Sequence, residues 1–414
     1  MDKLISIGKK ARIAAIKLAN YSTDGKNKAL KCMADNLMEE IPFILHENLK
    51  DLELGREKGV EKAFLDRLML DEKRINATAK GLLEIAKLPD PIGRVESKIK
   101  RPNGLCIEKR IVPMGVIGII YEARPNVTVD TSALCFKAGN AVILRGGSRA
   151  INSNKALVKV LKNALQEEGV SSEVIQLVED TKKSSAIQLM RMRNYIDLLI
   201  PRGGASLINS IVENSLVPVI ETGVGNCHIF IDESANLEMA KDIVINAKTS
   251  RPSVCNAVET LLIADSIALK YLPVILTELE ELGVDVRGCK KIKKLFPKYK
   301  IATEEDWYTE YLDYIISVKI VRDTEEAIKH INKYGTQHSE AIITENEENA
   351  ERFLQEIDAA VVYVNASTRF TDGFEFGMGA EIGISTQKLH ARGPMGLKEL
   401  TSYKYIVYGD GQIR

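Results

Sequence analysis

The residue whose type and position best suit covalent chemistry is Cys255, within the segment Ser250–Glu259. Residues 236–249, which precede this segment, place apolar side chains on one helical face, and Pro252 ends that pattern because its ring cannot continue a helix. A thiol on a rigid bend beside Arg251 and backbone amides is stabilised as a thiolate, which is the nucleophilic form. A small buried core cysteine is the alternative, because free cysteine is among the most buried residue types.

Two Gly-Gly turns are candidates for phosphate binding. Gly146 and Gly147 follow Arg145 at the end of an expected strand, and Gly203 and Gly204 follow another expected strand. Each turn precedes an expected helix, whose first N–H groups and dipole would hold an anion. No G-x-G-x-x-G motif stands in this region. A tight turn without a ligand is therefore the alternative interpretation.

The composition narrows the class of protein. The chain has 414 residues, enough for two or three domains, and 45% of them are apolar, which predicts a packed core. Lys+Arg and Asp+Glu both number 57, which argues against a strongly basic nucleic-acid binder. The six cysteines form no C-x-x-C pair and no zinc-ligand spacing with the five histidines, so no metal is expected and a reducing compartment fits best. The N-terminus lacks the apolar core of a signal peptide, and the longest apolar runs are too short to span a bilayer; we expect a cytoplasmic protein with no membrane contact.

The elements that would position these residues form an alternating pattern. Residues 1 to about 90 have helical spacing, and residues 95–112 read as a charged hairpin with a two-residue turn at Asn103-Gly104. Apolar strands expected at 116–121, 140–145, 174–179, 195–200 and 217–221 alternate with helices. This pattern predicts a parallel sheet covered on both faces, with ligands at the carboxyl ends of its strands.

A second α/β region is expected to follow the first. The alternation restarts at residue 228 and continues to 365, and this region contains Cys255. A Gly-rich segment follows over 366–393, and residues 403–408 read as an alternating strand without an obvious partner within the sheet. Such a strand often pairs with a neighbouring chain.

The segment from Arg251 to Ala257 resembles the active-site motif of the gamma-glutamyl phosphate reductase family, a branch of the aldehyde dehydrogenase superfamily. The resemblance covers essentially the whole chain, and further hallmarks are residues 121–126, 142–147, 221–225 and 321–342. It implies an α/β, aldehyde dehydrogenase-like fold with two Rossmann-like three-layer domains and a small oligomerisation element. The implied NADP-binding domain spans 1–226 with a return segment near 366–387. The catalytic domain spans 227–365, and residues 95–112 with 388–414 form the oligomerisation element.

The resemblance also implies a reaction, the NADPH-dependent reduction of L-glutamate 5-phosphate to L-glutamate 5-semialdehyde and phosphate in proline biosynthesis. Cys255 would attack the acyl phosphate and form a thioacyl-enzyme. Asn126 matches the superfamily's oxyanion asparagine, with the backbone N–H of Cys255 as second donor. Glu221 matches the general base of the hydrolytic enzymes, but a reductase need not activate water. Glu221 would therefore orient a proton donor or hold structure.

The implied binding roles concern the cofactor and the substrate. Arg145 matches the position that faces the adenosine ribose, Gly203 and Gly204 match the pyrophosphate turn, and Glu310 resembles the glutamate that bonds the nicotinamide ribose. Because no acidic residue follows the strand that carries Arg145, and Arg149 and Lys137 lie nearby, we expect NADPH to be preferred. The candidates for binding the charged ends of the substrate are Arg124, Arg251 and His338.

Several alternatives remain open at this point. A hydrolytic or CoA-linked aldehyde dehydrogenase would share the fold, and so would a binding protein that has lost catalysis. The expected partners are the small-molecule substrate, further copies of the chain in a dimer or tetramer, and a glutamate 5-kinase that supplies the acyl phosphate. The family resemblance implies that the hairpin and the C-terminal strand meet across a two-fold axis, each strand extending the other subunit's sheet.

Overall fold

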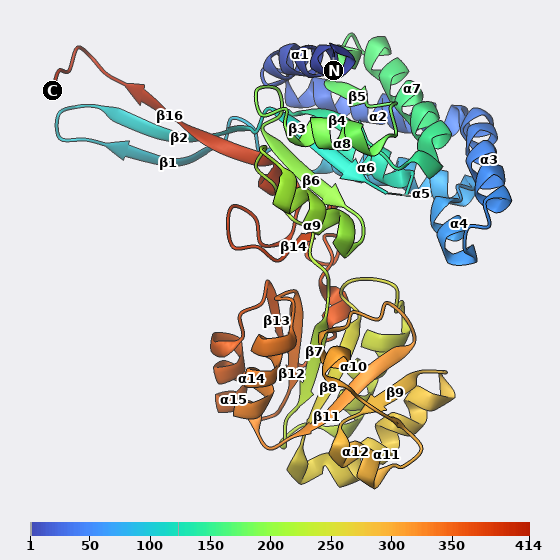
Figure 1. Ribbon diagram of the computed structural model, residues 1–414. Helices are drawn as coiled ribbons and strands as arrows, with labels where there is room; N and C mark the ends of the chain where they lie inside the picture. The colour runs from blue at the N-terminus through green and yellow to red at the C-terminus, as the bar shows by residue number, and fades with distance from the viewer. Residues whose placement is uncertain (1, 123) are drawn as a thin grey trace. The chain divides into compact units, whose positions relative to one another are not determined.

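The computed structural model describes residues 2–122 and 124–414, which form two compact units. The first unit comprises residues 1–222, 377–383 and 395–414, and the second comprises 223–376 and 384–394. Within the return segment expected near 366–387, only residues 377–383 belong to the first unit. Each unit is described by itself below, with the labels of Figure 1.

The first unit begins with the helical layer that the apolar spacing predicts. Its helices are α1 (Asp2–Leu18), α2 (Thr23–Glu39), α3 (Ile41–Glu57), α4 (Lys62–Leu68) and α5 (Glu72–Lys87). Leu30, Met33 and Leu37 of α2 are fully buried, as helical spacing requires of one face. Ser22 and Asp71 accept hydrogen bonds from Gly25 and Arg74, and these caps fix the starts of α2 and α5.

A four-stranded parallel sheet in the order β5-β4-β3-β6 forms the centre of the first unit. Its strands are β3 (Val116–Tyr121), β4 (Ala141–Arg145), β5 (Ile175–Leu177) and β6 (Leu198–Arg202). The intervening helices are α6 (Asn126–Lys137), η1 (Ser148–Ala150), α7 (Ile151–Glu167), η2 (Ser172–Val174), α8 (Lys183–Met190) and α9 (Ala205–Asn214). The prediction of a strand at 217–221 is wrong. Only Val219 forms a bridge, to Leu199, because the neighbouring Pro218 has no N–H to donate to a further bridge.

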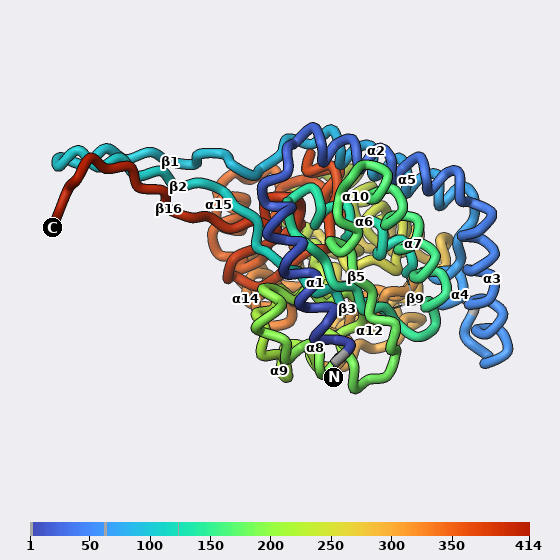
Figure 2. The backbone as a smooth tube through the Cα atoms, turned by 90° about the horizontal axis from the view of Figure 1, so that it is seen from above, coloured from blue at the N-terminus to red at the C-terminus, as the bar shows by residue number. Residues whose placement is uncertain are grey.

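A three-stranded antiparallel sheet projects from the first unit as an arm (Figures 1 and 2). Its strands are β1 (Val95–Lys100), β2 (Cys106–Pro113) and β16 (Thr401–Tyr408). The hairpin has a three-residue loop rather than the expected two-residue turn: Arg101 N–H bonds Leu105 O at 2.8 Å, and Gly104 takes a positive φ of 92°.

The strand at 403–408, for which no obvious partner within the sheet was expected, pairs with the hairpin of its own chain. β16 pairs with β2 from Thr401 to Tyr408, antiparallel and without interruption. This pairing could not be predicted from local sequence patterns, since the two strands lie almost three hundred positions apart in the chain. The outer strands of the sheet are β1 and β16.

The second unit is a seven-stranded parallel sheet in the order β10-β9-β11-β8-β7-β12-β13. Its strands are β7 (Cys227–Ile231), β8 (Val258–Ala264), β9 (Asp285–Gly288), β10 (Lys300–Ile301), β11 (Ile315–Val321), β12 (Ser339–Ile343) and β13 (Val361–Val364). Its helices are α10 (Leu237–Thr249), α11 (Asp265–Glu281), α12 (Lys290–Leu295), α13 (Glu304–Tyr308), α14 (Thr324–Tyr334), α15 (Glu347–Glu356) and η3 (Thr368–Phe370).

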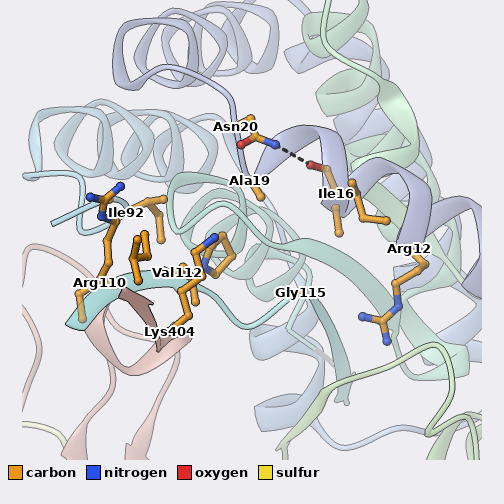
Figure 3. Close-up of a pocket in the computed structure, with 14 residues that line it drawn as sticks. Arg12, Ile16, Ala19, Asn20, Ile92, Arg110, Val112, Gly115 and Lys404 are labelled. Atoms are coloured by element: carbon orange, nitrogen blue, oxygen red, sulfur yellow. Dashed lines mark hydrogen bonds between the residues drawn. The ribbon is translucent and has the colours of Figure 1, made fainter. Parts of the chain in front are cut away.

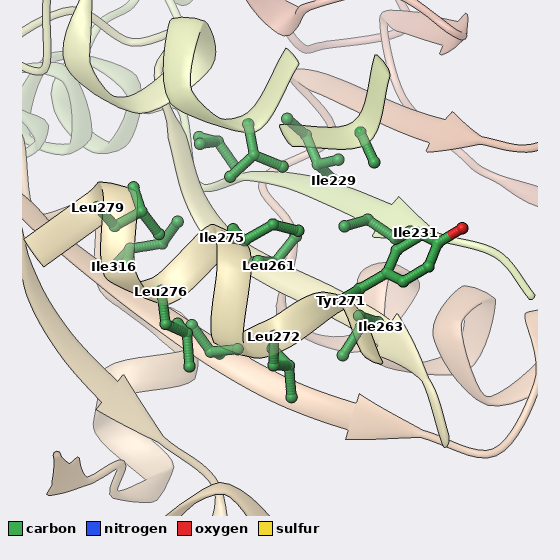
Figure 4. Packing of buried hydrophobic residues seen from close by; sticks show 14 of the residues in the cluster. Ile229, Ile231, Leu261, Ile263, Tyr271, Leu272, Ile275, Leu276, Leu279 and Ile316 are labelled. Atoms are coloured by element: carbon green, nitrogen blue, oxygen red, sulfur yellow. The ribbon is translucent and has the colours of Figure 1, made fainter. Parts of the chain in front are cut away.

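The core of the second unit explains why its strands read as continuous apolar runs. Ile229 and Ile231 of β7 and Leu261 and Ile263 of β8 pack against the buried face of α11, which includes Leu272 (Figure 4). A second cluster around Phe230 and Leu262 covers the opposite face of the same strands. Because both faces are covered, alternate residues in these strands are equally buried.

The last elements complete both units. β14 (Ile384–Ser385) and β15 (Gly393–Pro394) form a short antiparallel pair in the second unit, and η4 (Lys398–Leu400) precedes β16 in the first. Among the described residues, no helix is long and apolar enough to cross a membrane. The two parallel sheets agree with the aldehyde dehydrogenase-like architecture expected from the sequence.

Candidate active site

Cys255 lies on the bend between α10 and β8, as the sequence predicts. Asn236 caps the start of α10 through its side chain, and the helix ends at Thr249, three residues before Pro252. The N–H of Ala257 then bonds Val254 O at 3.1 Å, which closes a turn around Cys255. Cys255 is half-buried, and the buried strand β8 follows at once. The nucleophile candidate is thus held by a short, hydrogen-bonded turn with a rigid element on each side.

Two residues pack directly against the backbone carbonyl of Cys255. A Cβ built on Gly225 would lie 1.5 Å from the carbonyl oxygen, so only glycine fits there. On β7, the Cys227 thiol donates to the same oxygen at 3.2 Å. No sequence pattern indicates a role for Cys227, and Gly225 stands out only as part of the 221–225 hallmark. A glycine two residues before a buried strand was the available signal.

Two arginines supply positive charge to this turn. Arg251 is exposed, and the Arg369 side chain donates to Ser250 Oγ at 3.1 Å. Burial and the charge of Arg251 lower the pKa of the Arg369 guanidinium, whereas the charge of Cys255 opposes that lowering. Arg369 is therefore close enough to interact with a Cys255 thiolate. Sequence reasoning missed it, because it lies in a segment without periodicity and far along the chain.

Glu310 and His338 each contact the Cys255 turn through another residue, Glu310 through Gly225 and His338 through Cys227. The Glu310 carboxylate accepts the N–H of Gly225 at 2.7 Å. Burial raises the pKa of Glu310, and the Gly225 N–H and the charge of His338 oppose that rise. His338 is fully buried, with Nδ1 3.7 Å from Cys227 Sγ and 2.9 Å from Ser339 Oγ. The second unit thus brings Cys255, Glu310 and His338 around the start of β7.

The first unit positions Asn126 at the start of α6, where its side chain is exposed. Asn126 Nδ2 donates to Asp130 Oδ2 at 3.0 Å, one helical turn further on. Burial raises the pKa of Asp130 to about 6, and the bond from Asn126 and the charge of Arg202 oppose the rise. An amide nitrogen carries two hydrogens, so Asn126 keeps a second N–H to donate elsewhere. Ala123, in the same hallmark, lies outside the described residues.

Two further predicted residues of the first unit, Arg124 and Glu221, lie outside its helices and strands. Arg124 follows β3 and is half-buried, as is Glu221, which lies beyond the single bridge at Val219. The residue after Glu221 anchors its segment, because Thr222 Oγ1 donates to Pro201 O at 2.9 Å. Glu221 is therefore held beside the end of β6.

Both Gly-Gly turns stand at the carboxyl ends of parallel strands. Gly146 and Gly147 follow β4, Gly203 and Gly204 follow β6, and these two strands flank β3. A Cβ on Gly146 would lie 2.2 Å from Asn154 Nδ2, so close packing requires this glycine. The turns thus share one edge of the sheet, where the sequence predicts ligand binding.

The residues at this edge fit a nucleotide phosphate. A Cβ on Gly204 would meet nothing within 4 Å, and Gly204 precedes the N-terminus of α9, where backbone N–H groups have no helical partner. Arg145 donates through one nitrogen to Thr181 O and Lys182 O, while its buried Nε has no hydrogen-bond partner among the described residues. The Gly204 N–H itself donates to Glu122 Oε2 at 3.4 Å, so this carboxylate has to move aside when a phosphate binds. The remaining amides of the first turn of α9, the open space at Gly204 and a cation are what a dinucleotide phosphate needs.

The other two cations expected near the adenosine ribose are engaged in the helical layer. The Lys137 ammonium bonds Ala86 O at 3.0 Å in the buried core, and the Arg149 guanidinium stacks 4.5 Å from the centre of the Phe64 ring. Arg145 is therefore the cation of this group that stands at the strand end.

A pocket of about 520 Å³ lies in the first unit at the base of the arm (Figure 3). α1, β2 and β16 contribute its walls, and Arg110 and Lys404 bring positive charge to it. None of its lining residues is a predicted site residue. Arg110 is paired with Glu108 at 2.6 Å, so much of this charge is already balanced.

Comparison with known proteins relates the chain to a defined family. The aldehyde dehydrogenase family model matches residues 71–289 and 307–406. A gamma-glutamyl phosphate reductase of Caldicellulosiruptor bescii is 60% identical over the whole of both chains, and one of Clostridium perfringens is 59% identical, also over both complete lengths.

A solved structure agrees with these relatives. The crystal structure of gamma-glutamyl phosphate reductase from Thermotoga maritima matches with a TM-score of 0.97 at 52% identity, and the match covers 99% of each chain. Sequence and fold agree over essentially the full length, and the motif around Cys255 lies within the matched family region. The chain therefore belongs to the aldehyde dehydrogenase family, in its gamma-glutamyl phosphate reductase branch.

Proposed function

We propose that this chain reduces L-glutamate 5-phosphate to L-glutamate 5-semialdehyde with NADPH, releasing phosphate, as a step in proline biosynthesis. The observation that carries the proposal is the position of Cys255 in a hydrogen-bonded turn, beside which the Arg369 side chain bonds Ser250 Oγ. Full-length identity of about 60% to curated gamma-glutamyl phosphate reductases supports the choice of substrate.

Cys255 is the proposed nucleophile. Its thiolate attacks the carbonyl carbon of the acyl phosphate, the bond to the phosphate oxygen breaks, and phosphate leaves with the bonding electrons. A thioester to Cys255 remains. Sulfur suits both halves of this chemistry because a thiolate is a strong nucleophile and also a good leaving group. Arg369 and Arg251 stabilise the negative sulfur before attack and after its release.

Asn126 and the backbone N–H of Cys255 are the proposed oxyanion donors. Fixed donors aimed at the developing charge provide a large part of the rate enhancement in acyl transfer. Asp130 accepts one hydrogen of the Asn126 amide, which fixes the plane of the amide and leaves the other hydrogen for the substrate oxygen. We assign Glu221 to orienting a proton donor, since a reductase does not need to activate water.

The cofactor is proposed to bind along the carboxyl edge of the first sheet. Gly204 leaves open space for the diphosphate, and Gly146, Gly147 and Gly203 allow the close packing of the two turns beside it. Arg145 binds the 2′-phosphate of the adenosine ribose. Glu310 holds the nicotinamide ribose. When bound, NADPH supplies the hydride that converts the thioester to the aldehyde level.

Substrate charge is proposed to be balanced by Arg124 and Arg251. Guanidinium groups bind carboxylate and phosphate through paired hydrogen bonds. His338 lies against Cys227 and Ser339, so its proposed contribution is to support the Cys255 turn rather than to bind the substrate charge directly.

We further propose a cytoplasmic homo-oligomer, a dimer or tetramer, that receives its labile acyl phosphate from a glutamate 5-kinase. Among the described residues none of the six cysteines forms a disulfide, which fits a reducing compartment. The arm supports oligomerisation, because Tyr403, Tyr405 and Val407 expose half or more of their surface.

The test measures NADP⁺ reduction with glutamate semialdehyde in the presence and absence of phosphate. We expect strictly phosphate-dependent turnover in the wild type and its complete loss in Cys255→Ser, with an unchanged circular dichroism spectrum. Iodoacetamide should label Cys255 faster than the other five cysteines. Turnover without phosphate would instead identify a hydrolytic enzyme, and turnover that requires coenzyme A a CoA-linked one. A folded wild type without turnover would identify a binding protein.

A further inference from the structure

The carbonyl group of Cys255 is held on two sides. Gly225 packs so closely that a Cβ would overlap the carbonyl oxygen, and the Cys227 thiol donates to that oxygen at 3.2 Å. The carbonyl carbon is bonded to the Cα that carries both the thiol and the N–H of Cys255. Any displacement of this carbonyl therefore displaces the nucleophile and an oxyanion donor together.

The next peptide is held as firmly from the other direction. Thr368 Oγ1 donates to Asn256 O at 2.7 Å, and Asn256 Nδ2 donates to Thr371 O at 2.9 Å. With Asn256 fixed on this side, the main freedom left to the Cys255 carbonyl is a shift, together with its Cα, towards or away from β7. Cys227 stands at the first position of that strand.

Cys227 is itself fixed by a chain of polar side chains. Its Sγ lies 3.7 Å from His338 Nδ1, which lies 2.9 Å from Ser339 Oγ. Ser339 Oγ is 2.6 Å from Thr371 Oγ1, which is 2.8 Å from the Tyr363 hydroxyl. Thr371 also holds Asn256 through its backbone, so the chain closes on the residue that follows the nucleophile.

The protonation states of the two cysteines differ in a way that suits this arrangement. Burial raises the pKa of the Cys227 thiol well above its usual value, and the charges of Glu340 and Cys255 raise it further. Cys227 therefore keeps its proton when Cys255 is a thiolate. A thiol with a proton has one hydrogen to donate, and the nearest acceptor is the Cys255 carbonyl.

We propose that Cys227 is a positioning residue for the reductase reaction: its S–H, oriented by His338, fixes the peptide of Cys255 so that the nucleophile and its N–H keep the geometry that the reaction needs. The inference deepens the proposed function and rests on it. Small misplacements of a nucleophile are costly, because the reacting atoms must meet at near-contact distance and in line. Cys227 acts through Cys255 and touches no substrate atom.

The test compares Cys227→Ala, which removes the donor, with Cys227→Ser, which keeps one. We expect kcat to fall about tenfold or more in Cys227→Ala while KM for the semialdehyde stays within about twofold, the pattern of a lost transition-state interaction. Iodoacetamide should alkylate Cys255 severalfold more slowly in the same variant. Cys227→Ser should restore both quantities to within about threefold of the wild type, because a hydroxyl also donates.

A matched control separates positioning from packing. Cys135 on α6 is equally buried and distant in the sequence, so Cys135→Ala deletes a core thiol of the same size. The Cys135→Ala protein should unfold at a lower urea concentration than the wild type, as Cys227→Ala should, but its kcat and the alkylation rate of Cys255 should be unchanged. If the alanine variant at 227 does not fold, Cys227→Val, which fills the volume without a donor, takes its place and should show the same losses.

Two results would overturn the inference. One is a Cys227→Ala protein with wild-type kcat and alkylation rate, and the other is a Cys227→Ser protein as impaired as Cys227→Ala. The alkylation rate requires no turnover, so it tests the positioning of Cys255 even where the wild type shows no phosphate-dependent reaction. If the proposed function is wrong, the wild type lacks phosphate-dependent turnover. If only this inference is wrong, the wild type is active and the Cys227 variants alkylate at the wild-type rate.

Discussion

A Cβ atom on Gly225 would lie 1.5 Å from the carbonyl oxygen of Cys255, far inside any permitted contact. The clash is with backbone, so no side-chain rotation can relieve it. The N–H of Gly225 is tied to Glu310 at 2.7 Å, which prevents the glycine from moving away. A larger residue at position 225 therefore forces the carbonyl of Cys255 to shift.

Gly225→Ala should accordingly abolish most activity while the protein remains folded. We expect kcat to fall by about a hundredfold or more, because the nucleophile leaves its reactive geometry, and stability to fall by about 1–3 kcal/mol from overpacking. The assay is kcat at saturating substrate, with urea unfolding for stability. Gly81→Ala is the matched control, since a Cβ there meets nothing within 4 Å. An active Gly225→Ala enzyme would show that the Cys255 turn tolerates displacement.

Arg145 should determine the preference for NADPH. Its guanidinium stands at the end of β4, and a 2′-phosphate adds about two negative charges that NADH lacks. Arg145→Ala should weaken NADPH binding about tenfold or more and NADH binding about twofold at most. Fluorescence titration of both cofactors measures this, with Arg149→Ala as control because Arg149 stacks on Phe64 instead. Equal weakening of both cofactors would mean that Arg145 does not bind the 2′-phosphate.

The arm should carry the oligomer contact. Deleting residues 402–414 removes most of β16 and leaves one edge of β2 without its partner. Light scattering should then report smaller species than the wild type, and activity should fall. The gentler variant Tyr405→Glu keeps the backbone ladder and charges an exposed aromatic position, so it should also dissociate the oligomer. Unchanged mass in solution and unchanged turnover for both variants would contradict a role of the arm in assembly.

His330 should make the second unit sensitive to acid. It is buried on α14, and its Nδ1 lies 3.1 Å from the Lys319 ammonium. Burial first, and then the charges of His228, Lys319 and Lys333, lower the pKa of His330 to about 2. In the unfolded chain the pKa returns to its ordinary value near 6.5, so the unfolded state binds the proton more readily. The contribution of neutral His330 to the free energy of unfolding is therefore fully present above about pH 6.5, and it is lost progressively as the pH falls.

His330→Gln keeps an acceptor for Lys319 and removes the titration. Between about pH 6.5 and 5, the free energy of unfolding of the wild type should fall more steeply than that of the variant, by up to about 1.4 kcal/mol for each pH unit. Urea unfolding at a series of pH values measures the difference. Parallel curves for the two proteins would show that His330 does not control the acid response.

The sequence by itself determined the local architecture and the bend that carries Cys255. Continuous apolar runs predicted the buried parallel strands β3, β4, β7 and β8, because a sheet covered on both faces buries every side chain. The end of helical periodicity before Pro252 placed Cys255 on a bend, as observed. Each of these features depends on neighbours a few residues apart, which periodicity and single-residue chemistry can report.

Only the tertiary structure decided the contacts between distant parts of the chain. β16 pairs with β2, Gly225 and Cys227 hold the carbonyl of Cys255, and the Arg369 side chain bonds Ser250 at the start of the same segment. A strand's pattern shows which face is buried but not which strand lies beside it, and an unpatterned loop residue such as Arg369 gives no local signal. These contacts form when the sheet order brings separate strand ends together, so they exist only in the folded chain.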